Sequence, residues 1–72
     1  MNINYGKLLG KMKELGFTQE VLAPRIGISK GTLSAKFNSK TAFTATEIAD
    51  ICRVLDISKL DIGDYFFTEK VQ

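Results

Sequence analysis

The chain has no histidine, no tryptophan, one cysteine and one proline among its 72 residues. Zinc sites, Cys–His dyads and Ser–His–Asp triads therefore lack groups that they require. The single Cys52 cannot form a disulfide within the chain, which fits a reducing, cytoplasmic setting. No apolar run approaches the roughly 18–20 residues that cross a bilayer, and residues 1–10 lack the charged-then-apolar pattern of a signal peptide. We expect a cytoplasmic protein that does not contact a membrane.

The length allows one domain, so we expect residues 1–72 to form a single unit. A domain of this size buries only about 60% of the surface that its unfolded chain exposes, which leaves little structure to enclose a catalytic cleft. We predict that the protein is not an enzyme and that it has no catalytic residues, no metal, no cofactor and no small-molecule substrate.

The two halves of the chain carry opposite net charge. Residues 1–40 hold seven lysine or arginine side chains against two glutamates, a net charge of +5. Residues 41–72 hold three bases against six acids, a net charge of −3. This asymmetry favours a polyanion as the partner of the first half. For Lys7, Lys11 and Lys13 two interpretations stay open: a phosphate-facing surface, or the solvated face of a helix.

Apolar periodicity and capping residues predict an all-α domain of five helices. We expect helices over 5–15, 19–26, 30–37 and 44–55, and a short fifth helix after Ser58 that contains Leu60 and that Gly63 ends or breaks. The predicted N-caps are Thr18, Ser29, Ser58 and Thr44, the last in a capping box with Glu47. Gly16 and Gly27 are expected to end the first two helices. The residues predicted to face inward are Tyr5, Leu8, Leu9, Met12, Leu15, Leu33, Phe37, Ile48, Ile51, Cys52 and Leu55.

Three local features leave alternatives open. Pro24 removes a helical hydrogen bond, so it either kinks the second helix or ends it early. Gly6 and Gly10 either allow another backbone to approach or only weaken the first helix. In the tail, residues 64–72, the composition at 65–68 is strand-like, yet no partner strand is evident. Its aromatic run of Tyr65, Phe66 and Phe67 either closes the core or forms a patch for self- or partner-binding, because three consecutive aromatic residues cannot all face one interior.

The second and third helices have the requirements of a helix-turn-helix unit at residues 18–37. Ala23 supplies a small residue where the helices meet, and Gly27 tolerates a positive φ in the turn. Leu33 and Phe37 supply the apolar residues that hold the crossing. Each requirement has its own steric reason, so their coincidence predicts the motif.

The segment Gln19-Glu20, Ala23 and Ile26 to Ser34 resembles the lambda-repressor-like family, the Cro and CI repressors of temperate phages. The resemblance covers roughly residues 5–62. It implies a compact five-helix domain whose third helix enters the major groove of operator DNA. It also implies a homodimer on a two-fold symmetric operator, in the cytoplasm of a bacterial host. The short length and the tail from Tyr65 to Lys70 are similar to small phage switch proteins, some Cro-like and others antirepressors.

The resemblance places the DNA-binding side chains on and around the third helix. The implied set is Gln19, Ser29, Lys30, Thr32, Ser34, Lys36, Asn38 and Lys40. Of the base-facing positions, Gly31 and Ala35 carry no polar side chain, which departs from the family pattern. Lysines attract phosphates without reading sequence, so specific binding by this helix alone is expected to be weak.

Two functions follow from these patterns. The first is a Cro-like transcriptional regulator that binds double-stranded operator DNA through the helix that starts at Lys30. The second is an antirepressor that binds the basic DNA-reading face of a CI-type repressor and blocks it. The basic first half favours DNA, whereas the acidic second half and the few base-reading side chains favour the repressor protein.

Overall fold

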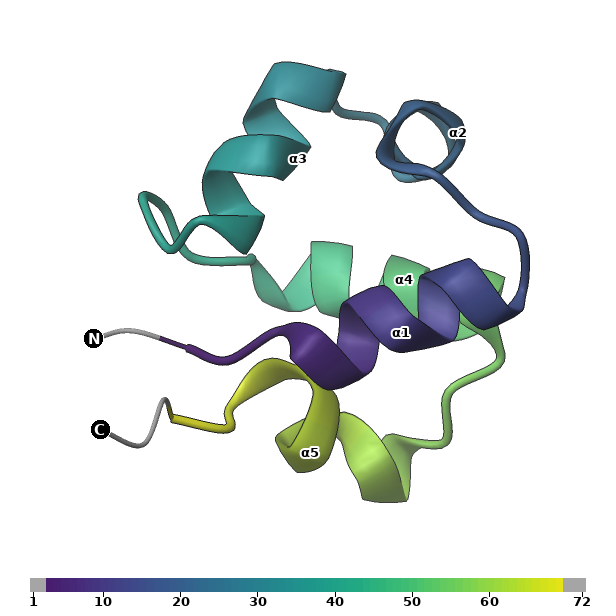
Figure 1. Cartoon of the computed structure of the whole chain (residues 1–72), viewed down its shortest axis with the longest axis vertical. Coiled ribbons are helices and arrows are strands. Elements are labelled where there is room, and N and C mark those ends of the chain that lie inside the picture. The colour runs from purple at the N-terminus through teal and green to yellow at the C-terminus, as the bar shows by residue number, and fades with distance from the viewer. Residues whose placement is uncertain (1–2, 70–72) are drawn as a thin grey trace.

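The computed structural model describes residues 3–69, and its regular elements there are all helical. In chain order they are α1 (Gly6–Glu14), α2 (Gln19–Arg25), α3 (Lys30–Phe37), α4 (Ala45–Leu55), the 3-10 turn η1 (Lys59–Asp61) and α5 (Ile62–Phe66). In Figure 1, α2 and α3 lie at one end of the molecule and α5 at the other, with α1 and α4 between them. The predicted all-α domain of five helices is confirmed. Within residues 3–69 no helix has the length and apolar character needed to cross a membrane.

Hydroxyl side chains begin four of the helical elements, as predicted. Thr18, Ser29, Thr44 and Ser58 each accept a hydrogen bond from a backbone N–H in the first turn of the element that follows. In the capping box, the Thr44 backbone N–H also donates to Glu47 Oε1 at 2.8 Å. A cap of this kind stabilises a helix by about 1 kcal/mol, so the boundaries are encoded locally.

Two glycines and one proline determine where α1 and α2 end. Gly16 and Gly27 have φ values of 78° and 77°, in the left-handed region that glycine adopts without strain. Helix α2 ends at Arg25, one residue after Pro24 and one residue earlier than expected. The proline nitrogen cannot donate to the carbonyl of Glu20, and near the end of a helix this costs a single bond. Pro24 lies inside α2, which continues for one residue beyond it, so the proline does not stop the helix where it stands.

The C-terminal region differs from the prediction. Gly63 lies inside α5 instead of ending the fifth helix, and Tyr65 and Phe66 are helical where a strand-like segment was expected. The side chain of Phe66 is only 2% exposed, and its burial offsets the cost of about 1 kcal/mol for a helical glycine. Beyond α5 the Asn4 N–H donates to the Thr68 carbonyl at 2.7 Å, beside an isolated antiparallel bridge from Ile3 to Glu69. The last residues of the predicted tail, Lys70 to Gln72, lie outside the described residues.

The core draws side chains from every helix. Its fully buried members are Leu8, Leu22, Ala23, Leu33, Ile51 and Leu55, with Tyr5, Met12, Ile26, Cys52, Ile57 and Phe66 nearly so. Cys52 is buried as expected, and burial raises the pKa of its thiol. Phe37 and Ile48 pack against the core while half-buried.

The predicted inward stripe of α1 is wrong at two positions. Tyr5, Leu8 and Met12 are buried, whereas Leu9 and Leu15 are 39% and 44% exposed. A helix advances 100° per residue, and the core contacts only the narrower face centred on Leu8.

The close approach considered for the glycines of α1 is absent. A Cβ added at Gly10 would meet nothing within 4 Å, and one added at Gly6 would meet only the Asn4 side chain. Among residues 3–69 no other backbone approaches this helix at either glycine, so their spacing has no packing role in the described part of the chain.

Candidate nucleic-acid interface

Helices α2 and α3 pack against each other around a short turn. The turn is held by the Ile28 N–H, which donates to the Ala23 carbonyl at 3.1 Å, and by the positive φ of Gly27. Ala23 and Leu33 are fully buried where the two helices meet. In Figure 1, α2 is seen almost end-on while α3 runs across the view, so their axes cross steeply. The residues predicted to form a helix-turn-helix unit adopt that local geometry.

The start of α3 is open to solvent. Ser29, Lys30, Gly31 and Thr32 are all exposed. Ser29 Oγ accepts the Thr32 N–H at 3.1 Å and donates to Thr32 Oγ1 at 2.9 Å. The serine is therefore engaged as the helix cap, while the threonine hydroxyl still has its own proton to donate outward.

Lys30 pairs across the motif with Glu20 on α2. Its Nζ lies 2.9 Å from Glu20 Oε1, and the two side chains are 58% and 73% exposed. The hydrogen bond and the charge of Lys30 lower the pKa of Glu20. Water screens exposed pairs of this kind, so they contribute little to stability, and Lys30 can exchange this carboxylate for another anion at little cost.

Lys36 is not on the surface, and its predicted contact with the DNA backbone is wrong. The residue is 6% exposed, and its Nζ donates to Glu47 Oε1 at 2.6 Å and to the Ala42 carbonyl at 3.1 Å. Burial raises the pKa of Glu47, but the hydrogen bonds from Lys36 and the Thr44 backbone, together with the Lys36 charge, outweigh it, so the net shift is downward. The ammonium therefore ties α3 to α4 and to the loop between them.

The sequence contained a signal for this inward lysine. Residues three and four apart share a helix face, and Lys36 is three residues after the buried Leu33 and adjacent to Phe37. It lies on the same side of α3 as the core residues. Glu47, the half-buried partner that was not among the predicted site residues, was identifiable only as half of the capping box.

The remaining predicted side chains fall into two groups. Gln19, half-buried at the first position of α2, is adjacent in sequence to Glu20, whose carboxylate pairs with Lys30 at the start of α3. Asn38 and Lys40 are exposed after the other end of α3, an eight-residue helix that spans about 12 Å. Ser34 is half-buried between the two groups. The set does not converge on one point, and a DNA duplex would meet its two groups at different phosphates.

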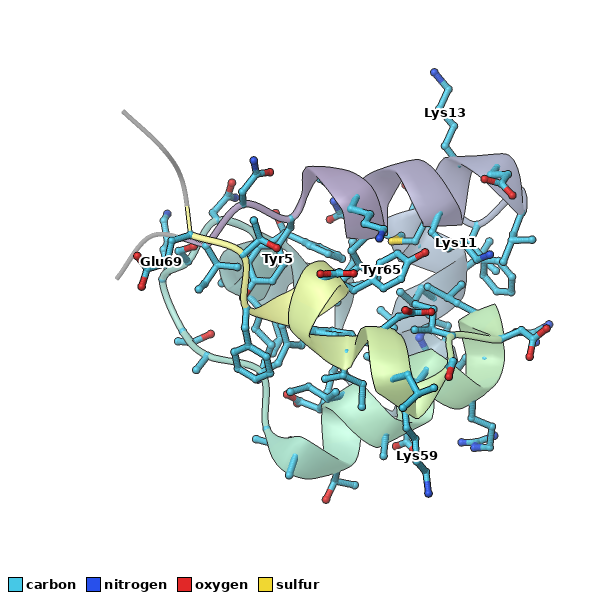
Figure 2. The ribbon with its side chains drawn as sticks, turned by 90° about the horizontal axis from the view of Figure 1, so that it is seen from below. Tyr5, Lys11, Lys13, Lys59, Tyr65 and Glu69 are labelled. Carbon is cyan, nitrogen blue, oxygen red and sulfur yellow. The ribbon has the colours of Figure 1, made fainter. Side chains whose placement is uncertain are left out.

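The basic residues of the first half are not gathered at α3. Lys7 faces α5, where its Nζ lies 3.5 Å from Asp64 Oδ2 and 4.8 Å from the centroid of the Tyr65 ring. Figure 2 views the molecule from the α5 side and shows Lys13 and Lys59 projecting at opposite edges of that face. Three of the seven bases in residues 1–40 are thus paired with carboxylates, namely Lys7, Lys30 and Lys36. The local charge at the start of α3 is much smaller than the net +5 of the segment.

Comparison with known proteins gives one family. The sequence profile of DUF739, described as "Protein of unknown function", matches residues 1–69. No curated protein is similar enough in sequence to count as a match. Within residues 3–69 no three His, Cys, Asp or Glu side chains come together in a group that could hold a metal ion.

Proposed function

The chain belongs to the DUF739 family, and we propose that this member is a Cro-like helix-turn-helix regulator of a phage lysis–lysogeny switch. In this proposal it acts in the cytoplasm of the bacterial host and binds operator DNA through α3. One observation carries the proposal: the start of α3 is exposed beside α2, with Lys30 and Thr32 accessible on its first turn. A helix presented in this way fits the major groove, where its first residues meet base edges.

Different side chains would make different contacts with the DNA. Lys30 and Thr32 would reach bases or the nearest phosphates, and Gln19 would contact a phosphate from the start of α2. Asn38 and Lys40 would contact the backbone farther along the duplex. Because Gly31 and Ala35 offer no polar group, a single copy would discriminate sequences poorly. Binding as a homodimer to a two-fold symmetric operator would double the number of readout contacts.

Binding to duplex DNA from the promoter region beside the gene tests this proposal. Fluorescence anisotropy should show specific binding by the protein alone. Lys30→Ala should weaken it about tenfold, since a charged group at the groove is worth about 1–3 kcal/mol. Lys59→Ala is the matched control, because it removes the same charge from η1 on the α5 side of the molecule. Equal loss in both variants, or no specific binding, contradicts the proposal.

One observation favours a second function, an antirepressor that binds a CI-type repressor. The α2–α3 surface carries an exposed carboxylate, Glu20, beside its one exposed lysine on α3, and Lys36 is buried. A carboxylate at this position repels a phosphate backbone but attracts the basic DNA-reading face of a repressor.

Mixing the protein with the repressor of the same switch separates the two functions. An antirepressor forms a stable complex in size-exclusion chromatography and releases the repressor from its operator. Glu20→Lys should then weaken the complex, whereas in a DNA-binding regulator the same change should strengthen DNA binding. Whether Glu20→Lys weakens the repressor complex or strengthens DNA binding decides between the antirepressor and the DNA-binding regulator.

A further inference from the structure

An apolar groove is lined by residues of the N-terminal segment, the loop after α3 and the end of α5. Figure 1 shows that the N-terminal segment and the chain after α5 lie on the same side of the molecule. The groove has a volume of about 390 Å³ and runs between the N-terminal segment, the loop after α3, the start of α4 and the end of α5. Its walls include Ile3, Phe43, Ile48, Phe66 and Phe67. This volume lies within the range of pockets that bind small ligands or large side chains.

The aromatic run of the tail explains why the groove is apolar yet open. Phe66 is buried in the core, and Tyr65 is half-buried against α1. Phe67 is 59% exposed, so it lines the groove with much of its ring still in water. Single exposed apolar residues are common on protein surfaces, but Phe67 differs from Leu60 because its ring continues the apolar lining of a groove, which is the form that ligand and protein sites take.

The groove carries charge of one sign. Among residues 3–69, Lys40 is the one charged residue that lines it, and its side chain is exposed. Within residues 3–69, Lys40 has no carboxylate within ion-pairing distance. An occupant that places a carboxylate beside Lys40 gains an ion pair at the rim of an apolar contact, where solvent screens it less.

The groove is also built on fixed supports. Ser39, which has a φ of 60°, accepts the Ile3 N–H at 3.3 Å through its hydroxyl, so the loop after α3 is joined to the N-terminal segment. The ring of Phe43 makes edge contacts with Tyr5, Phe37 and Phe66 at centroid distances of 5.5 to 5.6 Å. These contacts hold the walls in place, so an occupant meets a preformed surface.

We propose that this groove binds a segment of another protein that presents a large apolar side chain next to a carboxylate. The apolar side chain lies against Phe43, Ile48 and Phe67, and the carboxylate pairs with Lys40. The site lies at the opposite end of α3 from Lys30, and it shares Lys40 with the DNA-backbone contacts of the proposed function, so a bound segment and DNA would compete for that lysine. It gives the protein a second interaction surface.

Peptides of defined charge test the proposal by ¹⁵N–¹H NMR titration. One hexapeptide carries leucine and phenylalanine followed by two glutamates, and its counterpart carries two lysines in their place. The acidic peptide should shift the amide signals of Lys40 to Phe43, Ile48 and Phe67, and should bind at least about fivefold more tightly than the basic one. Lys40→Glu should reverse that preference, a result that loss of folding cannot imitate.

Matched apolar variants locate the site. Phe67→Ser should weaken the acidic peptide at least about fivefold, whereas Leu60→Ser should leave its affinity unchanged, because Leu60 is 94% exposed and lies outside the groove. Circular dichroism establishes that each variant is folded.

Four results overturn the proposal. The first two are absence of binding at millimolar peptide and equal affinity for the acidic and basic peptides. The third is that the small apolar acid 4-phenylbutyrate binds as tightly as the acidic peptide, and the fourth is a Phe67-dependent dimer in sedimentation. The last two would assign the groove to a small ligand or to a second copy of the chain.

Discussion

Lys36 shows that burying one charged side chain can remove it from the surface available to a ligand. Its ammonium lies 2.6 Å from Glu47 and also donates to the Ala42 carbonyl, so all of its hydrogen bonding is directed inward. Glu47 in turn accepts from the Thr44 backbone at 2.8 Å. A side chain assigned to DNA from its place in the motif is in fact part of the scaffold that holds α3 on α4.

Replacing Lys36 with alanine should therefore cost stability. The change leaves the Glu47 carboxylate largely buried without its cation. Breaking a fully buried pair costs about 3–5 kcal/mol, and the partial exposure of Glu47 puts the expected loss at or below the lower end of that range. Urea unfolding measures this loss as a lower midpoint with an unchanged slope. Lys40→Ala, which removes an exposed lysine four residues later, should stay within about 0.5 kcal/mol of the wild type. A loss below about 1 kcal/mol for Lys36→Ala would show that the pair contributes little.

The same pair makes stability depend on pH with a definite sign. The folded-state pKa of Glu47 lies below its usual value of 4.5, so the carboxylate binds a proton more readily in the unfolded chain. Its contribution is fully present above that value and is lost as pH falls through the folded-state pKa. Urea unfolding at about pH 7 and about pH 3 should show a smaller drop in stability for Glu47→Gln than for the wild type. An equal drop would assign the acid sensitivity to other carboxylates.

The helices follow local signals closely until the last one. The four hydroxyl caps and the two glycine ends were readable because each acts through the backbone of its immediate neighbours. A fifth helix after Ser58 was predicted, but its continuation through Gly63 to Phe66 was not, since that continuation depends on Phe66 entering a core contributed by distant residues. The candidate site was predictable only in part, for a related reason. The exposed start of α3 was predictable because its cap Ser29 fixes it locally, whereas the burial of Lys36 was not, because it requires Glu47 from another helix.

Two glycine substitutions should change stability in opposite directions. Gly27 has a φ of 77°, and a Cβ added there would meet no atom within 4 Å, so Gly27→Ala is penalised by backbone conformation alone, by about 1–2 kcal/mol. Gly10 lies within α1 with equal free space, so Gly10→Ala should stabilise by about 0.5–1 kcal/mol. Thermal unfolding of both variants measures whether each substitution lowers or raises the stability of the folded protein. A stable Gly27→Ala protein would mean that the turn between α2 and α3 relaxes to another conformation.

The net charge counted along the sequence differs from the charge that is exposed on any one face of the molecule. The first 40 residues carry +5, yet Lys7 faces α5, Lys36 is buried, and Lys30 has Glu20 beside it. The surface at the two ends of α3 is left with Lys30 and Lys40 as its exposed lysines. Charge counted along the sequence overestimates what a polyanion meets, because folding sends neighbouring lysines to different faces.

The salt dependence of DNA binding should reveal this difference. A protein that neutralises Z phosphates gives a slope of about −0.9Z when the logarithm of the binding constant is plotted against that of salt concentration. Lys30 and Lys40 alone predict a slope of about −2 per protomer, whereas engagement of all seven bases of residues 1–40 would give about −6. Anisotropy titrations over a salt series measure it. Lys40→Ala should reduce the slope by about 1 and Lys13→Ala should leave it unchanged, because Lys13 projects from α1 on the view from below in Figure 2. A slope steeper than about −4, or one sensitive to Lys13, would mean that the DNA lies along α1 and not across α3.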